Sequence, residues 1–136
     1  MKISNSEFLR YSKQIILKKI GISGQTKIFS TKVLIVGVGG LGCPLALYLA
    51  NTGVGIIGLI DNDKVDISNL NRQILFNTND IGKYKVVQAK KFLNKVNKKT
   101  KVNIYNDRLT EKNIKKILNK YDIICDCSDN FATRYL

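Results

Sequence analysis

Histidine and tryptophan are both absent from the 136 residues, and the chain has one proline and three cysteines. Without histidine the chain holds no Ser-His-Asp or Cys-His pair, no HExxH metal site and no histidine general base. No apolar run is long enough to cross a bilayer, so we expect no membrane partner. Three cysteines with no export signal favour a reducing compartment, the cytoplasm, or the plastid stroma if the gene is organellar.

Acidic residues are also scarce, since 10 Asp and Glu stand against 23 Lys and Arg and the net charge is +13. A basic chain can attract nucleic acid or an acidic protein. Its cations are mostly lysine, and Asn and Ile are plentiful too, a mixture typical of AT-rich genomes. No aromatic residues interleave the lysines as single-strand binding requires, so we expect no nucleic-acid partner.

Short β-branched apolar runs alternate with amphipathic segments. They predict buried strands at 32–36 and 56–60, further strands at 102–105 and 122–127, and helices at 44–51, 83–97 and 111–119. Residues 63–79 are polar and without a clear period, which favours a long functional loop or short helical pieces. Strands alternating with helices predict an α/β, Rossmann-like fold with a mainly parallel sheet and flanking helices.

We interpret residues 1–136 as a single domain, with N-terminal helices over 1–30 and the Rossmann-like core over 31–136. One helix is predicted from Ser6, its cap, to Ile20, followed by Gly21 at its end. Residues 131–136 read as the start of another helix. The sequence ends after four predicted strands and the first residues of a further helix, which is a poor point for such a sheet to stop. We therefore expect a C-terminally truncated piece of a longer protein.

A glycine-rich turn joins the first predicted strand to its helix. Gly37, Gly39 and Gly42 form the pattern GxGxxG, with Gly40 inside it. Glycines let the backbone turn tightly and approach a phosphate, whose charge the helix N-terminus stabilises. Asp61 ends the next strand, at the spacing of a carboxylate that binds ribose hydroxyls. The turn predicts a nucleotide site, but NAD, FAD, a methyl-donor nucleoside and ATP all suit it.

Polar side chains crowd the segment after the second strand. Arg72 can neutralise phosphate with its planar fork, and Asn69 and Gln73 can donate amide N–H groups. Lys85 lies at a helix start, where the dipole disfavours a cation unless an anion intervenes, so it suits a phosphate ligand. A solvated surface lysine is the alternative interpretation of Lys85.

Asp129 follows the fourth strand, and a carboxylate beside phosphates usually acts through Mg²⁺. Asp126, on the strand itself, is interpreted as structural or as a secondary polar contact. Such groups suit attack by an acid on a nucleotide's α-phosphate, which needs positioning, charge neutralisation and a metal. A hydride-transfer enzyme has less use for Arg72, Lys85 and Asp129 together.

Taken in order, these motifs resemble the ThiF/MoeB/HesA family, the prokaryotic-type relatives of ubiquitin-activating enzymes. The resemblance runs from about residue 8 to 136 and rests on RYSKQ at 10–14, GVGGLG at 37–42, DND at 61–63, SNLNRQ at 68–73, GKYK at 82–85 and DCSDN at 126–130. It implies adenylation, with ATP and Mg²⁺, of the C-terminal glycine of a ubiquitin-like sulfur-carrier protein (MoaD- or ThiS-like). The pathway implied is molybdopterin or thiamine thiazole biosynthesis, with a slight lean to molybdopterin, and the expected assembly is a homodimer.

The resemblance also assigns residue roles. Nucleotide contacts are implied for Gly37, Gly39, Gly40, Gly42, Asp61, Asp63, Ser68, Asn69, Arg72, Gln73, Lys85, Asp129 and Asn130. The implied catalytic residues are Arg72, Lys85, Asp129 and Lys13, with Asp129 as the Mg²⁺ ligand. The family usually has arginine at position 13, on a helix that reaches the partner subunit's ATP site. Lysine keeps the charge there but loses the bidentate fork.

The cysteines do not make a metal site. Zinc is expected only in a later C-terminal part with two CxxC pairs, which these 136 residues lack, because Cys125 and Cys127 are too few for structural zinc. Cys43 follows the glycine loop, and a small buried hydrophobic side chain is favoured there over a reactive thiolate. Two other functions stay open: an inactive nucleotide-binding or dimerisation remnant, and an NAD-binding Rossmann oxidoreductase.

Overall fold

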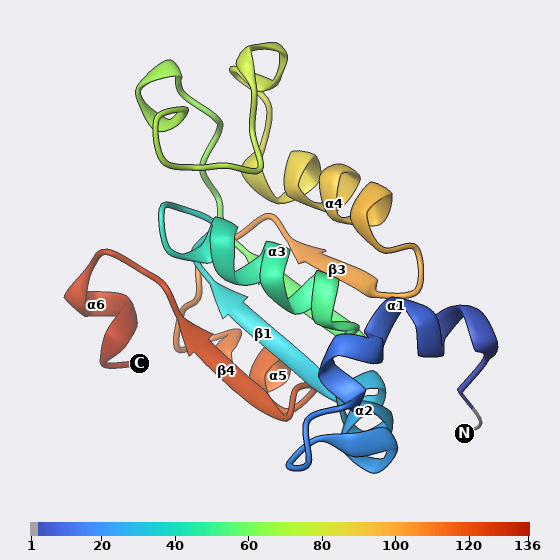
Figure 1. Ribbon diagram of the computed structural model, residues 1–136. Helices are drawn as coiled ribbons and strands as arrows, with labels where there is room; N and C mark the ends of the chain where they lie inside the picture. The colour runs from blue at the N-terminus through green and yellow to red at the C-terminus, as the bar shows by residue number, and fades with distance from the viewer. Residues whose placement is uncertain (1–2) are drawn as a thin grey trace.

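A parallel sheet forms the centre of the computed structural model, which describes residues 3–136 (Figure 1). In these residues the strands are β1 (Lys32–Val36), β2 (Ile56–Ile60), β3 (Lys101–Tyr105) and β4 (Ile123–Asp126), in the order β3-β2-β1-β4. All four predicted strands are confirmed, and β1 and β2 match to the residue. Val36 lies level with Ile60 and with Asp126, so the three strands end side by side.

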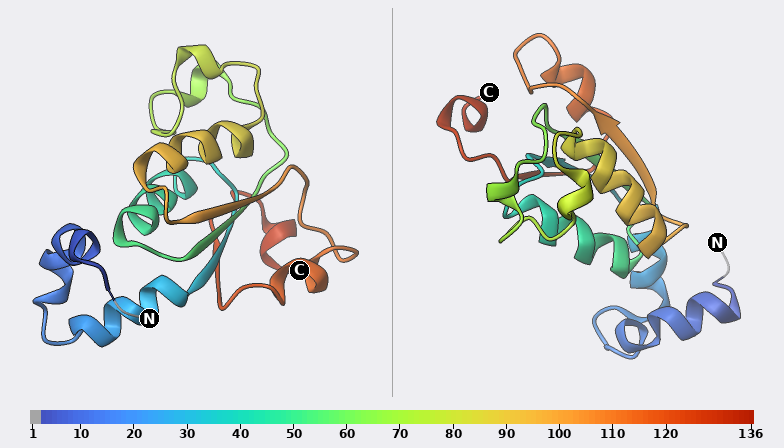
Figure 2. Two further views of the ribbon diagram at one scale, coloured as in Figure 1. Left: turned by 90° about the vertical axis from the view of Figure 1, so that its right-hand side faces the viewer. Right: turned by 90° about the horizontal axis from the view of Figure 1, so that it is seen from above.

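Helices cover both faces of the sheet, which confirms the Rossmann-like prediction (Figures 1 and 2). On one face lie α3 (Gly42–Thr52), which joins β1 to β2, and α4 (Lys85–Val96), which joins β2 to β3. On the other lies α5 (Ile114–Leu118), in the connection that returns from β3 past two strands to β4. The chain therefore changes direction between β1 and β4, and ligands of such sheets bind at that point.

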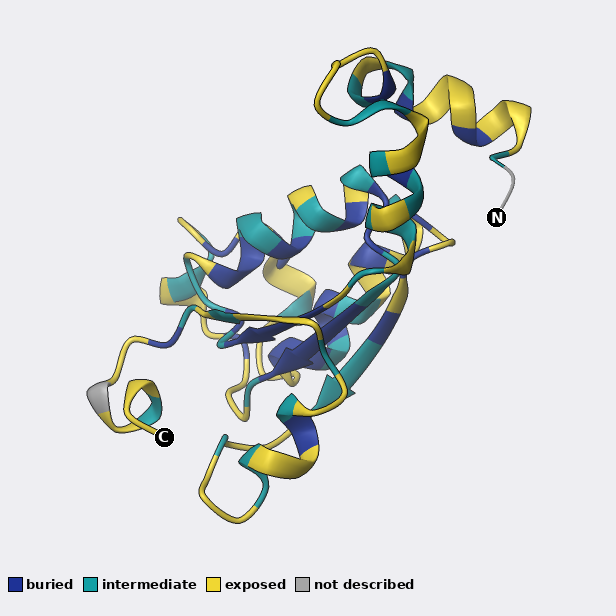
Figure 3. Ribbon diagram, turned by 90° about the horizontal axis from the view of Figure 1, so that it is seen from below, coloured by how far each residue is buried: buried dark blue, intermediate teal, exposed yellow. Residues whose placement is uncertain are grey.

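Two apolar clusters hold the layers together, because side chains alternate between the faces of each strand. Ile35 and Leu59 pack with Ala46 of α3 and Ala89 of α4 in the larger cluster. The smaller cluster, on the α5 side, consists of the buried residues Leu34, Val36, Ile60 and Ile117. Figure 3 shows buried residues along the central strands, while β4, at the edge of the sheet, is mostly exposed. The apolar pattern of the helix predicted at 83–97 puts Phe92 on the side that faces the sheet, but Phe92 is 37% exposed.

The long segment after β2 follows the prediction of short helical pieces. It contains two 3₁₀ turns, η1 (Ile67–Asn69) and η2 (Thr78–Asp80). An isolated antiparallel bridge between Lys64 and Tyr84 brings its two ends together. The loop is thereby closed at its base, so that α4 begins beside the end of β2.

The single helix predicted over residues 6–20 is wrong, because the segment holds one helix and a turn. The structure has α1 (Asn5–Ile15), a turn, and then α2 (Gly21–Ser30), which leads into β1. Ser4, not Ser6, caps α1: its Oγ accepts a hydrogen bond from the Glu7 N–H at 3.3 Å, and the Glu7 carboxylate accepts one from the Ser4 N–H at 2.8 Å. This reciprocal capping box fixes the start of the helix. The last element, α6 (Phe131–Arg134), begins where a helix was predicted.

Buried polar contacts attach α1 to the core. Asn97 donates through Nδ2 to the Tyr11 hydroxyl and to the Ala50 carbonyl, both at 2.8 Å. Lys99 Nζ lies 2.6 Å from Glu7 Oε1. These contacts join α1 to the C-terminal ends of α3 and α4, far from the carboxyl ends of the strands. No helix among residues 3–136 is both long and apolar enough to span a membrane.

Glu7 provides a pH-dependent test of this attachment. Hydrogen bonds from Lys99 and then Ser4 lower the pKa of Glu7 from 4.5 to about 2. Because the folded-state pKa lies below the unfolded one, the carboxylate stabilises the fold above about pH 4.5, and this contribution disappears as the pH falls toward about 2. Urea unfolding should therefore show wild type more stable than Glu7→Gln at neutral pH, with the difference shrinking in acid. A difference that is constant across this range would contradict the ion pair.

Candidate active site

A cavity of about 560 Å³ opens at the carboxyl ends of the strands. The loops after all four described strands contribute to its wall, with Arg72, Gln73 and Lys85 from the long segment and the start of α4. The cavity lies where the chain changes direction between β1 and β4. Its volume falls within the range of about 300–1,000 Å³ usual for small-molecule sites.

The glycines of the turn after β1 have two different functions. A Cβ on Gly42 would lie 2.0 Å from the Gly37 carbonyl oxygen, and a Cβ on Gly37, where φ is +91°, would lie 3.0 Å from the Cys127 carbonyl oxygen. These two glycines allow the turn to close. At Gly39 and Gly40 the nearest atoms to a Cβ are side-chain atoms of Gln73 at 3.7 Å and Arg72 at 3.5 Å. Both of these glycines line the cavity.

Asp61, at the end of β2, holds the glycine turn. Its Oδ2 accepts a hydrogen bond from the Val38 N–H at 2.8 Å, and its Oδ1 accepts one from the Asp63 N–H at 2.7 Å. Both oxygens keep lone pairs, because a carboxylate has about four acceptor positions. The ribose contact of Asp61 stays a prediction. Asp61 lines the cavity, as that contact requires.

Lys85 is buried, with a side chain only 7% exposed, and its Nζ lies 3.3 Å from Oδ2 of Asp63, which is 62% exposed. A buried ammonium needs anionic or polar partners. The Lys85 backbone N–H also donates to the Asp63 carbonyl at 3.0 Å, which fixes the start of α4 against the end of β2. The structure therefore excludes the solvated surface lysine and places this cation in the cavity wall.

Arg72 also lines the cavity, but its predicted neighbours Ser68 and Asn69 do not. Ser68 Oγ donates to Asp66 Oδ1 at 2.6 Å and so lowers the pKa of Asp66, while Asn69 Oδ1 accepts from the Asp66 N–H at 3.2 Å. These contacts build η1. Arg72 Nη1 then donates to the Ser68 carbonyl at 2.9 Å, with its aliphatic stem beside Gly40. Phosphate contacts by Ser68 and Asn69 stay predictions.

The loop after β4 carries two carboxylates with different surroundings. Asp126 Oδ1 accepts hydrogen bonds from the Ser128 N–H at 2.9 Å and the Ser128 hydroxyl at 2.6 Å. Asp129 is exposed on the cavity wall, and within the described residues no hydrogen bond to its carboxylate is found. Asn130, also in the wall, accepts from the Thr133 N–H at 2.9 Å. Asp126 is therefore structural, and Asp129 is the carboxylate open to a ligand.

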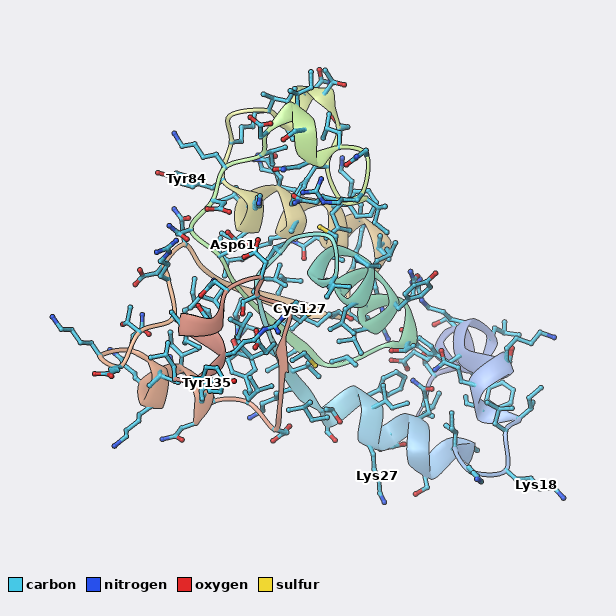
Figure 4. All side chains as sticks on the ribbon, turned by 90° about the vertical axis from the view of Figure 1, so that its left-hand side faces the viewer. Lys18, Lys27, Asp61, Tyr84, Cys127 and Tyr135 are labelled. Carbon is cyan, nitrogen blue, oxygen red and sulfur yellow. The ribbon has the colours of Figure 1, made fainter. Side chains whose placement is uncertain are left out.

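Lys13 lies outside the cavity, exposed on α1. Figure 4 shows Asp61 and Cys127 near the middle of the molecule, while Lys18 and Lys27, which follow α1 along the chain, lie at one end of it. Any role of Lys13 in nucleotide chemistry therefore needs the cavity of a second copy. The trans role implied for it stays a prediction.

The structure also adds residues that the motifs did not mark. Asp107, Arg108 and Leu109, after β3, and Thr133 and Arg134, in α6, line the cavity. The rule that ligands bind beyond the carboxyl ends of parallel strands would have pointed to the loop after β3. No such signal marked α6, because its place follows from tertiary packing.

The wall fits a nucleotide with Mg²⁺. Gln73 is 4% exposed, and within residues 3–136 its Oε1 has no hydrogen-bond partner, so it can accept from a ligand donor such as a hydroxyl. Arg72 and Lys85 supply cations for phosphates. Mg²⁺ is usually held by one or two carboxylates together with substrate phosphates and water, and Asp129 supplies such a carboxylate. The part of the chain that is described gathers no cluster of three metal-ligating side chains.

A parallel sheet with a glycine turn, two cations and an open carboxylate at its switch point defines a nucleotide-binding, Rossmann-like domain. The profile of the ThiF family matches residues 11–136, and the chain belongs to that family. This confirms the resemblance drawn from the motifs.

Similar proteins agree with this assignment. The chain is 48% identical to the adenylyltransferase and sulfurtransferase MOCS3 of Culex quinquefasciatus over 135 residues, which are 99% of this chain and 31% of that protein. It is 50% identical to the adenylyltransferase and sulfurtransferase uba4 of Aspergillus niger over 132 residues, 97% of this chain and 27% of that protein. The chain thus spans less than a third of these curated relatives.

Solved structures share the fold. The Escherichia coli tRNA N6-threonylcarbamoyladenosine dehydratase TcdA in complex with ATP is 28% identical, with a TM-score of 0.88 over 96% of this chain and 53% of that one. E. coli MccB with MccA-N7isoASN is 32% identical, with a TM-score of 0.84 over 96% of this chain and 39% of that one. One of these neighbours therefore holds ATP.

The contact between Gly42 and Gly37 predicts a position-specific cost. Gly42→Ala forces the turn apart and should destabilise the fold by about 1–3 kcal/mol, the usual cost of overpacking. Gly39→Ala adds the same methyl group where the nearest atom lies at 3.7 Å, and should leave the midpoint of denaturant unfolding nearly unchanged. Equal midpoints for the two variants would contradict the described turn.

Cys43 should be unreactive in the folded protein. The side chain is fully buried, its Sγ donates to the Val38 carbonyl at 3.6 Å, and burial raises the pKa of the thiol to about 12. At pH 8 it is therefore protonated. We expect iodoacetamide and mass spectrometry to find Cys43 modified only after unfolding. Modification of Cys43 in the native protein, at a rate matching that of a free thiol, would contradict its burial.

Proposed function

We propose that the chain is the nucleotide-binding part of an ATP-dependent adenylyltransferase that acts on a ubiquitin-like sulfur-carrier protein. The observation that carries the proposal is the convergence of Arg72, Lys85 and Asp129 on one cavity beside an open glycine turn. Membership of the ThiF family and the similarity to MOCS3 and uba4 adenylyltransferases support it.

In this proposal the cavity binds ATP through the backbone of Gly39 and Gly40 and through the cations of Arg72 and Lys85. Asp61 contacts the ribose hydroxyls, with Gln73 as a further acceptor. Asp129 holds Mg²⁺, which neutralises phosphate charge when bound. The buried Lys85 ammonium matters most, because a charge acting in a partly desolvated site is screened little by water.

The reaction needs no protein nucleophile, which suits a chain without histidine. A carboxylate oxygen of the carrier's C-terminal glycine attacks the α-phosphorus, forming an acyl-adenylate. The bond between the α-phosphorus and the bridging oxygen breaks, and pyrophosphate leaves with that electron pair. Arg72 and Lys85 stabilise the charge that moves onto the leaving group, and positioning in the cavity supplies the remaining acceleration.

We further propose that the carrier is MoaD- or ThiS-like and that the pathway is molybdopterin or thiamine thiazole synthesis. The reaction takes place in the cytoplasm, or in the plastid stroma if the gene is organellar. A homodimer would bring Lys13 of one subunit to the cavity of the other. The net charge of +13 would favour encounter with an acidic carrier, because complementary charge raises association rates.

Pyrophosphate exchange tests the proposal with a matched pair of variants. ATP–pyrophosphate exchange should require Mg²⁺ and a carrier ending in Gly-Gly. Lys85→Met removes the buried cation and should lower the exchange rate by about 100-fold or more, as loss of a preorganised electrostatic group does. Lys91→Met changes an exposed lysine of the same helix and should leave the rate unchanged.

Binding measurements beside the exchange assay distinguish the two alternative functions. Binding of ATP without exchange, in the protein made from its complete reading frame, would favour the nucleotide-binding remnant. Enhanced NADH fluorescence on binding, with no affinity for ATP, would favour the oxidoreductase. Equal loss in the Lys85 and Lys91 variants would remove Lys85 from the chemistry.

A further inference from the structure

Arg134 of α6 lines the cavity but belongs to none of the residue roles described above. Its Nη2 donates to the Ser128 carbonyl at 3.0 Å, and its Nε lies 3.8 Å from Asp126 Oδ2. Both partners lie in the segment that leads from β4 to Asp129. The guanidinium fork thus contacts this segment at two points, a geometry that a lysine ammonium cannot reproduce.

The same segment is also held by hydrogen bonds within it. Asp126 Oδ1 accepts the Ser128 N–H at 2.9 Å and the Ser128 hydroxyl at 2.6 Å. The N–H, hydroxyl and carbonyl of Ser128 are therefore all engaged, the first two by Asp126 and the last by Arg134. Because Asp129 is the next residue, these contacts set the direction in which the chain presents its carboxylate.

The carboxylates of Asp126 and Asp129 have different surroundings, and Arg134 contributes to this difference. The oxygens of Asp126 face Ser128 and the Arg134 cation, so Asp126 is occupied within the fold. Asp129 lies three positions after Asp126 in the chain, and among the described residues no hydrogen bond to its carboxylate is found. An outer group that orients a metal-binding carboxylate contributes to metal affinity without touching the metal.

We propose that Arg134 is a positioning residue, which acts through Asp126 and Ser128 to hold Asp129 open to Mg²⁺ in the cavity. The proposal rests on the proposed nucleotide site. It assigns Arg134 no contact with the phosphates. It predicts that Arg134 affects the part of ATP affinity that depends on the metal, and not the part that comes from the cations and the glycine turn.

The test measures the affinity for ATP by titration calorimetry, once with Mg²⁺ and once with a chelator, in the protein made from its complete reading frame. Arg134→Lys should lower the gain in affinity due to Mg²⁺ by about 10-fold, within the range of outer-shell substitutions. The affinity for metal-free ATP should be retained. Asp126→Asn should have the same effect, and the double variant should lose no more than either single variant, because the residues act as one unit.

Two controls separate the possible explanations. Arg108→Lys alters another arginine of the cavity wall, which among the described residues forms no ion pair with Asp126, and should retain the ratio between the two affinities. In an Asp129→Ala background, Arg134→Lys should change neither affinity. Arg134→Gln repeats the measurement without a cation if the lysine variant folds poorly.

Several results would overturn the proposal. Equal loss of affinity with and without Mg²⁺ in Arg134→Lys would show a direct contact with phosphate. A lowered melting temperature with an unchanged ratio would show a purely structural residue. If the wild-type protein binds no ATP, both the proposed function and this inference are wrong. If the wild-type protein shows Mg²⁺-dependent ATP binding and Arg134→Lys does not change it, only the inference is wrong.

Discussion

The parallel register of β1 with its two neighbours is the constraint on which the site depends. It places Val36, Ile60 and Asp126 at one level, so the three chains leave the sheet side by side. The glycine turn, the Asp61 loop and the Asp129 loop then start from the same edge. The chain leaves β1 toward α3 on one face of the sheet and reaches β4 from α5 on the other, so the topology changes direction between β1 and β4, and the cavity opens there.

Hydrogen bonding within the loops decides which polar residues remain available to a ligand. Hydrogen bonds within a 3₁₀ turn occupy the side chains of Asp66, Ser68 and Asn69. The Asp126 carboxylate accepts a hydrogen bond from the Ser128 hydroxyl. Arg72 and Asp129, by contrast, lie on the cavity wall at the ends of these built segments. A dense run of polar residues therefore separates into a scaffold and a smaller set that faces the cavity.

Much of this could be predicted from sequence. β1 and β2 were predictable because each contains a short, continuous apolar run, and the glycine turn because its spacing permits only a close strand–helix connection. The start of α1 was missed, although Ser4 and Glu7 have the S-x-x-E spacing of a capping box, and the turn between α1 and α2 carried no such signal. Arg134 and the loop after β3 join the cavity through tertiary packing, which no local pattern encodes. The role implied for Lys13 stays a prediction, because it requires a second chain, and one sequence carries no geometry for that.

We propose that this cavity joins AMP to a carrier's C-terminal carboxylate. Intact-mass spectrometry of a Gly-Gly-ended carrier, incubated with the protein, Mg²⁺ and ATP, detects that product. We expect a carrier species heavier by one adenylyl group, which disappears with hydroxylamine and does not form with Asp129→Ala. An unmodified carrier in the presence of protein that binds Mg-ATP would contradict it.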